Sequence, residues 1–366
     1  MHVAVHTSDD GRQRRPSIIP LAMLKLRTTL TTLPLELIDH ILAFLSWPTD
    51  LHSLLFVNRF LSPIAERILY SHISDLPAQR AVRLLLSLAN APATRCALVK
   101  NLSLDFSDNR VLFALELLIA KVLRLLPRLR SLNVEVSIHE NRHRALAWIF
   151  PRDTPFRLLT FATSIRLDQD LATFLESQPE IRDLSLRGMP ACTSDPFTIP
   201  RSALPHLESF RSVHVDPDTL GEVIATRPVQ GISLSLFSEH GYRALEVLAR
   251  TSTPVRRLTI LIIDASAPNE LFPQLAARLP HLEALHIVAL VQQYSLDTLL
   301  ASAPLLEAFA GLRFLTFIAS GSSCYQLDDE ATVAEQWARA CPTLTTIILP
   351  KGRVWFASSE GKWEHS

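Results

Sequence analysis

The sequence predicts an α/β repeat solenoid preceded by a small all-α unit of three helices. The 366 residues are 48% hydrophobic but only 7% aromatic, so the apolar content is mainly aliphatic. A short apolar pattern recurs through most of the chain, whereas residues 30–75 show helical spacing without strand alternation. We therefore expect a flexible tail at residues 1–29, the helical unit at 30–75, a repeat domain at 76–350 and a C-terminal tail at 351–366.

The recurring pattern is an apolar residue followed by apolar residues three and five positions later, usually behind a proline. It reads PRLRSLNV from Pro127 and PHLEALHI from Pro280. The alternation at its end predicts a short strand with one buried face, and the proline ends the helix that precedes each strand. The first apolar positions recur every 22 to 30 residues, with a last interval of 38, and are Val99, Leu129, Leu158, Ile181, Leu207, Val229, Val255, Leu282, Leu306 and Leu344.

A strand–helix unit of this kind cannot bury its apolar face alone, so the units are expected to stack. The pattern resembles the leucine-rich-repeat superfamily over residues 76–350. The Asn or Cys that the family places after each strand is missing in most copies, so we expect an irregular leucine-rich-repeat arc. An ordinary α/β domain with parallel strands would produce the same alternation and remains the alternative.

Residues 30–75 predict three short helices. Pro34 suits the first helical position, because its missing N–H is not needed there, and Leu37, Ile41, Phe44 and Leu45 form one apolar stripe behind it. The second helix is expected near Asp50 and the third from Ser62-Pro63. A unit of this size buries little apolar surface in its own core. We therefore expect a partner protein to bury more of its apolar side chains.

These residues resemble the F-box. The resemblance rests on Leu33-Pro34-Leu35-Glu36-Leu37, Asp50-Leu51 and Val57-Asn58-Arg59, which occur in order and register and lead into Leu69-Tyr70. The way these motifs lead through Leu69-Tyr70 into irregular leucine-rich repeats also resembles the large fungal F-box group. The resemblance implies docking on the Skp adaptor of a cullin–RING ubiquitin ligase, through an interface and supporting core formed by Leu33, Pro34, Leu37, Ile41, Leu45, Leu51, Leu54, Val57, Leu61 and Leu69. A helical cap for the solenoid is the alternative.

Composition excludes several classes of function. Lys plus Arg and Asp plus Glu are both 36, and a net charge of zero argues against nucleic acid or a membrane surface as the partner. The four cysteines lack metal-ligand spacing, which excludes a zinc ribbon or a RING-type site. Four cysteines in so long a chain also argue against a disulfide framework, which favours a reducing compartment, cytoplasmic or nuclear. The sequence has neither a phosphate-binding glycine loop nor a nucleophile elbow, so we expect no catalytic residue and no cofactor.

One motif points to metal chemistry instead. His139-Glu140-Asn141-Arg142-His143 matches H-E-x-x-H, in which two imidazoles on one helix face bind zinc and the glutamate acts as base. Arginines flank the second histidine, and no convincing third ligand follows. We therefore expect no metal site, and a zinc hydrolase is kept as a remote alternative that zinc analysis would test.

Polar residues between the buried strand positions predict a recognition surface. They are expected to face the inner side of the repeats, where solenoids usually bind, and the candidate substrate-binding residues are Asn133, Glu135, Asp183, Arg187, Arg257 and His286. The long last interval contains residues 316–341, which are either a candidate binding loop or a disordered excursion. The tail after Pro350 is unusually aromatic for a terminus and is a candidate cap for the last repeat.

The sequence as a whole predicts a non-catalytic protein with two protein partners. The helical unit would hold the Skp-type adaptor and through it the cullin, while the repeats would present an unidentified protein substrate. The alternative is a leucine-rich-repeat scaffold or receptor that acts outside ubiquitin transfer.

Overall fold

The computed structural model describes residues 33–45, 48–137, 144–189, 197–213, 216–236, 242–262, 268–289, 294–319, 327–357 and 363–365. The chain divides into two compact units, Met1–Leu69 and Tyr70–Ser366, which we call unit 1 and unit 2. The division falls six residues before position 75, where the sequence placed the end of the helical unit. None of the described helices is long and apolar enough to cross a membrane.

Unit 1 is built from helices around a very small core. The helices are α1 (Leu35–Ala43), α2 (Pro48–Leu54) and α3 (Leu61–Ser71), the last of which runs on into unit 2. Ile38, Leu42, Leu61 and Ile64 form the buried cluster, because two residues from each of α1 and α3 face one another. The third helix is capped by Asn58, whose Oδ1 accepts the N–H groups of Phe60 and Leu61, rather than by Ser62.

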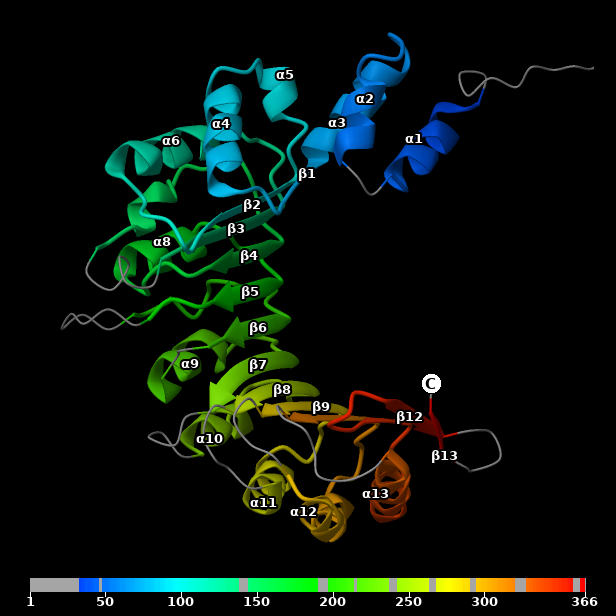
Figure 1. Ribbon diagram of the computed structural model, residues 1–366. Coiled ribbons are helices and arrows are strands. Elements are labelled where there is room, and N and C mark those ends of the chain that lie inside the picture. The colour runs from blue at the N-terminus through cyan, green and yellow to red at the C-terminus, as the bar shows by residue number, and fades with distance from the viewer. Residues whose placement is uncertain are drawn as a thin grey trace, which may run out of the picture. The chain divides into compact units, whose positions relative to one another are not determined.

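Unit 2 contains a sheet whose thirteen described strands lie side by side in sequence order (Figure 1). Neighbouring strands from β1 to β11 are parallel. The strands are β1 (His72–Ile73), β2 (Asn101–Phe106), β3 (Ser131–Val136), β4 (Thr160–Thr163), β5 (Asp183–Leu186), β6 (Ser209–Ser212), β7 (Gly231–Leu236), β8 (Arg257–Ile262), β9 (Ala284–Ala289), β10 (Phe314–Ala319), β11 (Thr346–Ile348), β12 (Val354–Ala357) and β13 (Trp363–His365).

Helices precede most of the strands and cover one face of the sheet (Figure 1). They are α4 (Ala78–Ala89), α5 (Ala93–Cys96), α6 (Phe113–Leu123), α8 (Gln169–Glu176), α9 (Pro217–Ile224), α10 (Arg243–Ala249), α11 (Pro268–Arg278), α12 (Leu296–Ala301) and α13 (Leu327–Ala340), with 3₁₀ turns η3 (Ala147–Ile149) and η5 (Ala303–Ala308).

The core of unit 2 consists of rows of apolar side chains that run across the strands. Parallel registration places Leu102 beside Leu132, and Leu132 beside Phe161, and the same row continues to Ile347 on β11. These residues are all but fully buried, because alternate strand residues point under the helices. One cluster joins the buried residues from Ile73 to Trp355, which is the stacking that the repeat pattern predicts.

The repeat register predicted from the sequence is wrong at one position. Leu306, predicted as the apolar residue before a strand, lies in η5, and Leu312 takes that role two residues before β10. Both leucines are fully buried, so the apolar pattern alone could not separate them. With Leu312, the spacings become 30 residues from Leu282 and 32 residues to Leu344, and the long last interval disappears.

The segment 316–341 is therefore largely a regular repeat rather than a binding loop. Its described residues continue β10 and form α13, in which Trp337 is fully buried and donates its indole N–H to the carbonyl of Leu299 at 2.9 Å. Residues 320–326 lie outside the described part of the chain.

The described residues of the segment 351–366, which are 351–357 and 363–365, extend the sheet and so cap the last repeat rather than forming a free tail. β12 pairs antiparallel with β11, and β13 pairs antiparallel with β12. Trp355 lies opposite Ile347 and is 3% exposed, so the aromatic residues cover the last parallel strand. This arrangement satisfies a sheet edge that would otherwise be open.

Candidate functional site

The outward face of the sheet, which we call the strand face, carries the alternate side chains of β2 to β11. Three rows of residues form it in register. The first row includes Asn101, Ser131, Asp183 and Arg257; the second includes Ser103, Asn133, Arg211, His286 and Thr316; the third includes Asp105, Glu135, Ser235, Leu261, Val288 and Ile318.

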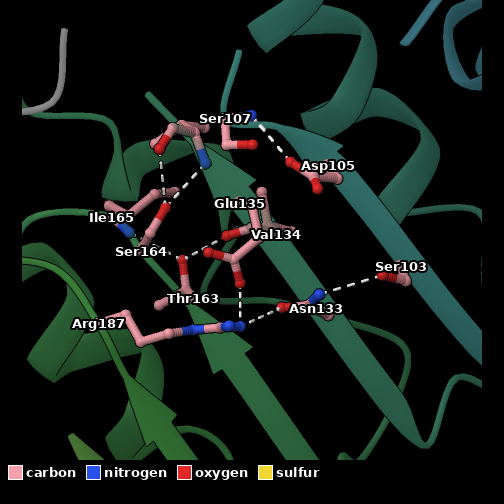
Figure 2. Close-up of polar contacts among 11 residues, drawn as sticks. Ser103, Asp105, Ser107, Asn133, Val134, Glu135, Thr163, Ser164, Ile165 and Arg187 are labelled. Atoms are coloured by element: carbon pink, nitrogen blue, oxygen red, sulfur yellow. Dashed lines mark hydrogen bonds and ion pairs between the residues drawn. The ribbon is translucent and has the colours of Figure 1, made fainter. Parts of the chain in front are cut away.

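A polar network occupies the strand face at β2, β3 and the end of β5 (Figure 2). Arg187 is its centre, because its guanidinium forms an ion pair with Glu135 and donates to Asn133 Oδ1 at 3.1 Å. Asn133 in turn donates from Nδ2 to Ser103 Oγ at 3.0 Å. Three strands that are distant in sequence are thus joined by one set of side chains.

Two carboxyl groups with opposite pKa shifts belong to this network. Asp105 lies opposite Glu135 in register, and its Oδ1 accepts the Ser107 N–H at 2.9 Å, which lowers the pKa of Asp105. Burial raises the pKa of Glu135, although Arg187 acts in the opposite direction. The Glu135 side chain is 14% exposed and that of Arg187 is 37% exposed, so the pair lies at the surface rather than in the core.

Thr163, the last residue of β4, and Ser164, directly after it, fix the backbone of β3 behind the network. Thr163 donates to the Val134 carbonyl at 3.0 Å, and Ser164 accepts the Val136 N–H at 2.8 Å and donates to its carbonyl at 3.0 Å. Such fixed backbone positions hold Asn133 and Glu135 in a defined geometry. The carboxyl oxygens of Asp105 and Glu135 can accept hydrogen bonds from a basic or amide group of a partner.

Only three of the six predicted substrate-binding residues meet in this network: Asn133, Glu135 and Arg187. Asp183 and Arg257 share the first row but stand three strands apart. A side chain at Gly231 would meet the Arg257 guanidinium at 3.4 Å, which shows that Arg257 extends over β7. His286 on β9 is a separate feature, because its Nδ1 lies 2.9 Å from Thr316 Oγ1 and burial lowers its pKa.

The strand face becomes apolar towards its C-terminal end, which the sequence analysis missed. Leu261, Val288 and Ile318 follow Ser235 in the third row, and Phe314 begins β10 with 45% of its surface exposed. The signal was present in the sequence, since β8, β9 and β10 carry apolar residues at both alternations. Such strands are typically buried on both faces.

Unit 1 exposes apolar side chains on a second face of α1, about 110° around the helix from the face that contacts its core. Leu37, Ile41 and Phe44 share one helix face and are 51%, 42% and 74% exposed, whereas Ile38 and Leu42 are buried. We call these three residues the outward row. Further exposed apolar side chains follow α2 and are Phe56, Val57 and Phe60.

The residues assigned to the adaptor interface and its supporting core divide by burial. Pro34, Leu37, Ile41 and Val57 are exposed. Leu51 and Leu61 are buried, and the remaining four, half-buried, are Leu33, Leu45, Leu54 and Leu69. The ion pair between Asp39 and Arg67 joins α1 to α3 beside this surface.

The H-E-x-x-H motif lies outside the described residues, which resume at Arg144. Within the described part of the chain, no group of three or more His, Cys, Asp or Glu side chains is arranged to hold a metal ion. Cys96 and Cys341 are buried and unpaired by disulfides in that same part.

The stacked strand–helix units and the in-register parallel sheet define the architecture of unit 2 as a leucine-rich-repeat-like solenoid. No family model matches the chain, and no curated protein matches it. Among solved structures, a similar chain occurs in the crystal structure of a TLR13–ssRNA13 complex, with 16% identity and a TM-score of 0.37. The alignment covers 72% of this chain and 37% of that one.

Proposed function

We propose that this protein is a substrate-recognition adaptor of a Skp–cullin–F-box ubiquitin ligase. In this proposal, unit 1 docks on a Skp-type adaptor and through it on a cullin, while the strand face of unit 2 binds a protein substrate. The catalytic step belongs to other subunits. The order of the F-box-like motifs in residues 33–70 supports the first contact, and the repeat scaffold supports the second.

The observation that carries the proposal is that α1 is apolar on two neighbouring faces. One side supplies Ile38 and Leu42 to the small core, and the outward row stays in water. A solvent-facing row of Leu, Ile and Phe on so short a helix costs solubility and marks a protein contact. Its burial against a partner helix would also compensate for the small core of unit 1.

Co-purification of the full chain with a Skp-type adaptor tests the first contact. We expect the wild-type chain to retain the adaptor, and the double variant Leu37→Asp with Ile41→Asp to lose it, because both side chains face outward. Leu33→Ala with Pro34→Ala tests the start of the motif in the same assay. Leu159→Asp, at a half-exposed leucine on unit 2 that is 38% exposed, is the matched control and should retain the adaptor.

Retention of the adaptor by the aspartate variants, or its absence from the wild-type preparation, would contradict the proposal. Circular dichroism of each variant separates loss of binding from loss of fold. A second readout concerns the cullin, which should join the complex only when the adaptor is present.

The strand face favours one alternative function. Its polar network and apolar end suffice to bind a protein whether or not ubiquitin is transferred, so a scaffold or receptor is the second candidate. That alternative predicts adaptor binding without a cullin in pull-downs. Proximity labelling with ligase activity blocked would identify the strand-face partner, and Arg187→Glu should reduce its labelling if the network contacts it.

A further inference from the structure

An open apolar groove of about 670 Å³ lies between α4 and α6 of unit 2. These two helices run close together at the N-terminal end of the sheet (Figure 1). Val82 and Leu86 contribute from α4, and Leu115 and Leu117 contribute from α6. The groove is formed by helices, so it is distinct from the strand face on the other side of the sheet.

The leucines at the groove are unusually exposed for a helix pair that packs together. Leu86 is 50% exposed, Leu112 is 63% exposed and Leu117 is 49% exposed. Side chains of this size gain free energy when they leave water, at about 25 cal/mol per Å² of apolar surface. Three of them around one groove therefore provide a docking surface for an apolar ridge.

The charges around the groove have one sign. Arg110 and Lys121 line it, and none of the described residues that line it is acidic. The acid of α6, Glu116, is turned inward, where its side chain is 2% exposed and accepts from Arg144 at 2.5 Å. The described exposed face of α6 thus presents leucines and a lysine without a compensating carboxylate.

Among the described residues that line the groove and the hollow next to it, the carboxylates lie beyond one end of the groove. Asp105, Asp108 and Arg80 line a neighbouring hollow. The hollow shares Ala78, Gln79 and Asn109 with the groove. Lys121, towards the end of α6, is far from that hollow along the helix. A ligand that carries acidic groups is consequently favoured with those groups towards Lys121.

We infer that the α4–α6 groove binds an amphipathic helix of a protein partner, whose apolar ridge lies on the exposed leucines and whose acidic flank faces Lys121. A groove between two helices suits this mode of recognition, because residues spaced by three and four along the incoming helix form a continuous ridge. The groove is a second protein-binding surface of unit 2, beside the strand face, and does not depend on adaptor binding by unit 1.

Fluorescence anisotropy with a labelled model peptide and the full chain tests the inference. The probe is a helical peptide of about 18 residues, with leucine at i, i+3, i+4 and i+7 and glutamate on both flanks. A second peptide carries lysine in place of glutamate. The wild-type chain should bind the glutamate peptide more tightly than the lysine peptide.

Two variants divide the apolar contribution from the charge contribution. Leu117→Asp should weaken binding about tenfold or more, since it places a carboxylate on the apolar floor. Lys121→Glu should weaken the glutamate peptide about fivefold and tighten the lysine peptide, because rim charges set electrostatic complementarity. The matched controls are Leu159→Asp and Lys100→Glu, and both should leave the affinities for the two peptides unchanged. Lys100 lies just before the start of β2, whereas the groove is lined by Phe106 at the other end of that strand.

Equal binding of the two peptides by the wild-type chain would overturn the inference. So would a Lys121→Glu effect no larger than that of Lys100→Glu. Sedimentation velocity gives the third decision: a wild-type dimer that Leu117→Asp converts to a monomer would assign the groove to a second copy of this chain. Thermal unfolding of each variant shows whether the fold is retained.

Discussion

The α-carbon of Gly188 packs directly against the backbone of Ile165. A Cβ atom at position 188 would lie 1.9 Å from the Ile165 carbonyl oxygen, which is far inside van der Waals contact. The close approach occurs just after β5, beside Arg187 of the polar network. Glycine is required there by the space available.

Gly188→Ala is therefore expected to destabilise the protein by about 1–3 kcal/mol, because the backbone of the two adjoining turns must separate. Gly221→Ala is the control: Gly221 lies within α9, and its new Cβ would lie 3.5 Å from Val247 Cγ1 on α10, an ordinary contact. That change should be neutral or stabilising by up to about 1 kcal/mol, since alanine favours a helix. Urea denaturation of both variants checks the difference, and equal midpoints would contradict the packing argument.

Arg227 fastens the loop before β6 to the end of α9. The buried guanidinium donates to the carbonyls of Pro200 and Ala203 on the loop, at 2.9 Å and 2.8 Å, and to those of Glu222 and Val223 on the helix, at 2.8 Å and 2.7 Å. Arg227→Met should cost at least about 3 kcal/mol, because four carbonyls lose their donor.

The control for Arg227 is Arg243→Met. Arg243 is 62% exposed and lies 3.5 Å from Asp218, so its loss should change the free energy of unfolding by less than about 0.5 kcal/mol. Chemical denaturation measures both. A small loss for Arg227→Met would show that water replaces the guanidinium at these carbonyls.

Arg187 holds down a pKa that burial raises. The pKa of Glu135 is raised by burial, and the guanidinium of Arg187 partly offsets that effect. Arg187→Gln should raise the pKa of Glu135 further, because the nearby positive charge is removed. Carboxyl NMR titration of glutamate-labelled protein measures the change. Arg182→Gln, which disrupts the exposed pair with Glu208 at 2.9 Å, should leave the pKa of Glu135 where it is.

His286 should make stability depend on mildly acidic pH. Burial lowers its pKa below the ordinary value of 6.5, so the unfolded chain takes up the proton more readily than the folded chain. The free energy of unfolding contributed by this group therefore falls as pH drops from about 6.5 through the lowered pKa. His286→Gln should show a smaller fall in melting temperature between pH 7.5 and pH 5 than the wild-type protein. An identical pH dependence would assign the effect to other groups.

The repeat architecture of unit 2 is predictable from the amino-acid sequence alone. Nine of the ten predicted apolar positions lie two residues before a strand and are buried, because the alternation and the spacing are local properties of the chain. The prediction for the tenth position, Leu306, was wrong, because a buried 3₁₀ turn and the buried residues before a strand share the same apolar pattern. The same local reasoning indicated that strand residues such as Asn133 and Glu135 point away from the buried face of the sheet.

Which of these residues come into contact depends on how the strands pack in the folded chain. Arg187 reaches Asn133 across 54 residues of sequence, and this contact depends on the register of β3, β4 and β5 rather than on any local pattern. The packing of unit 1 decided that Ile38 and Leu42 face its core while the outward row stays exposed, a choice that two equally apolar stripes leave open. Edge pairing likewise made strands of the C-terminal segment. Such contacts are non-local, so the stacking of the whole chain determines them and no short stretch of sequence can.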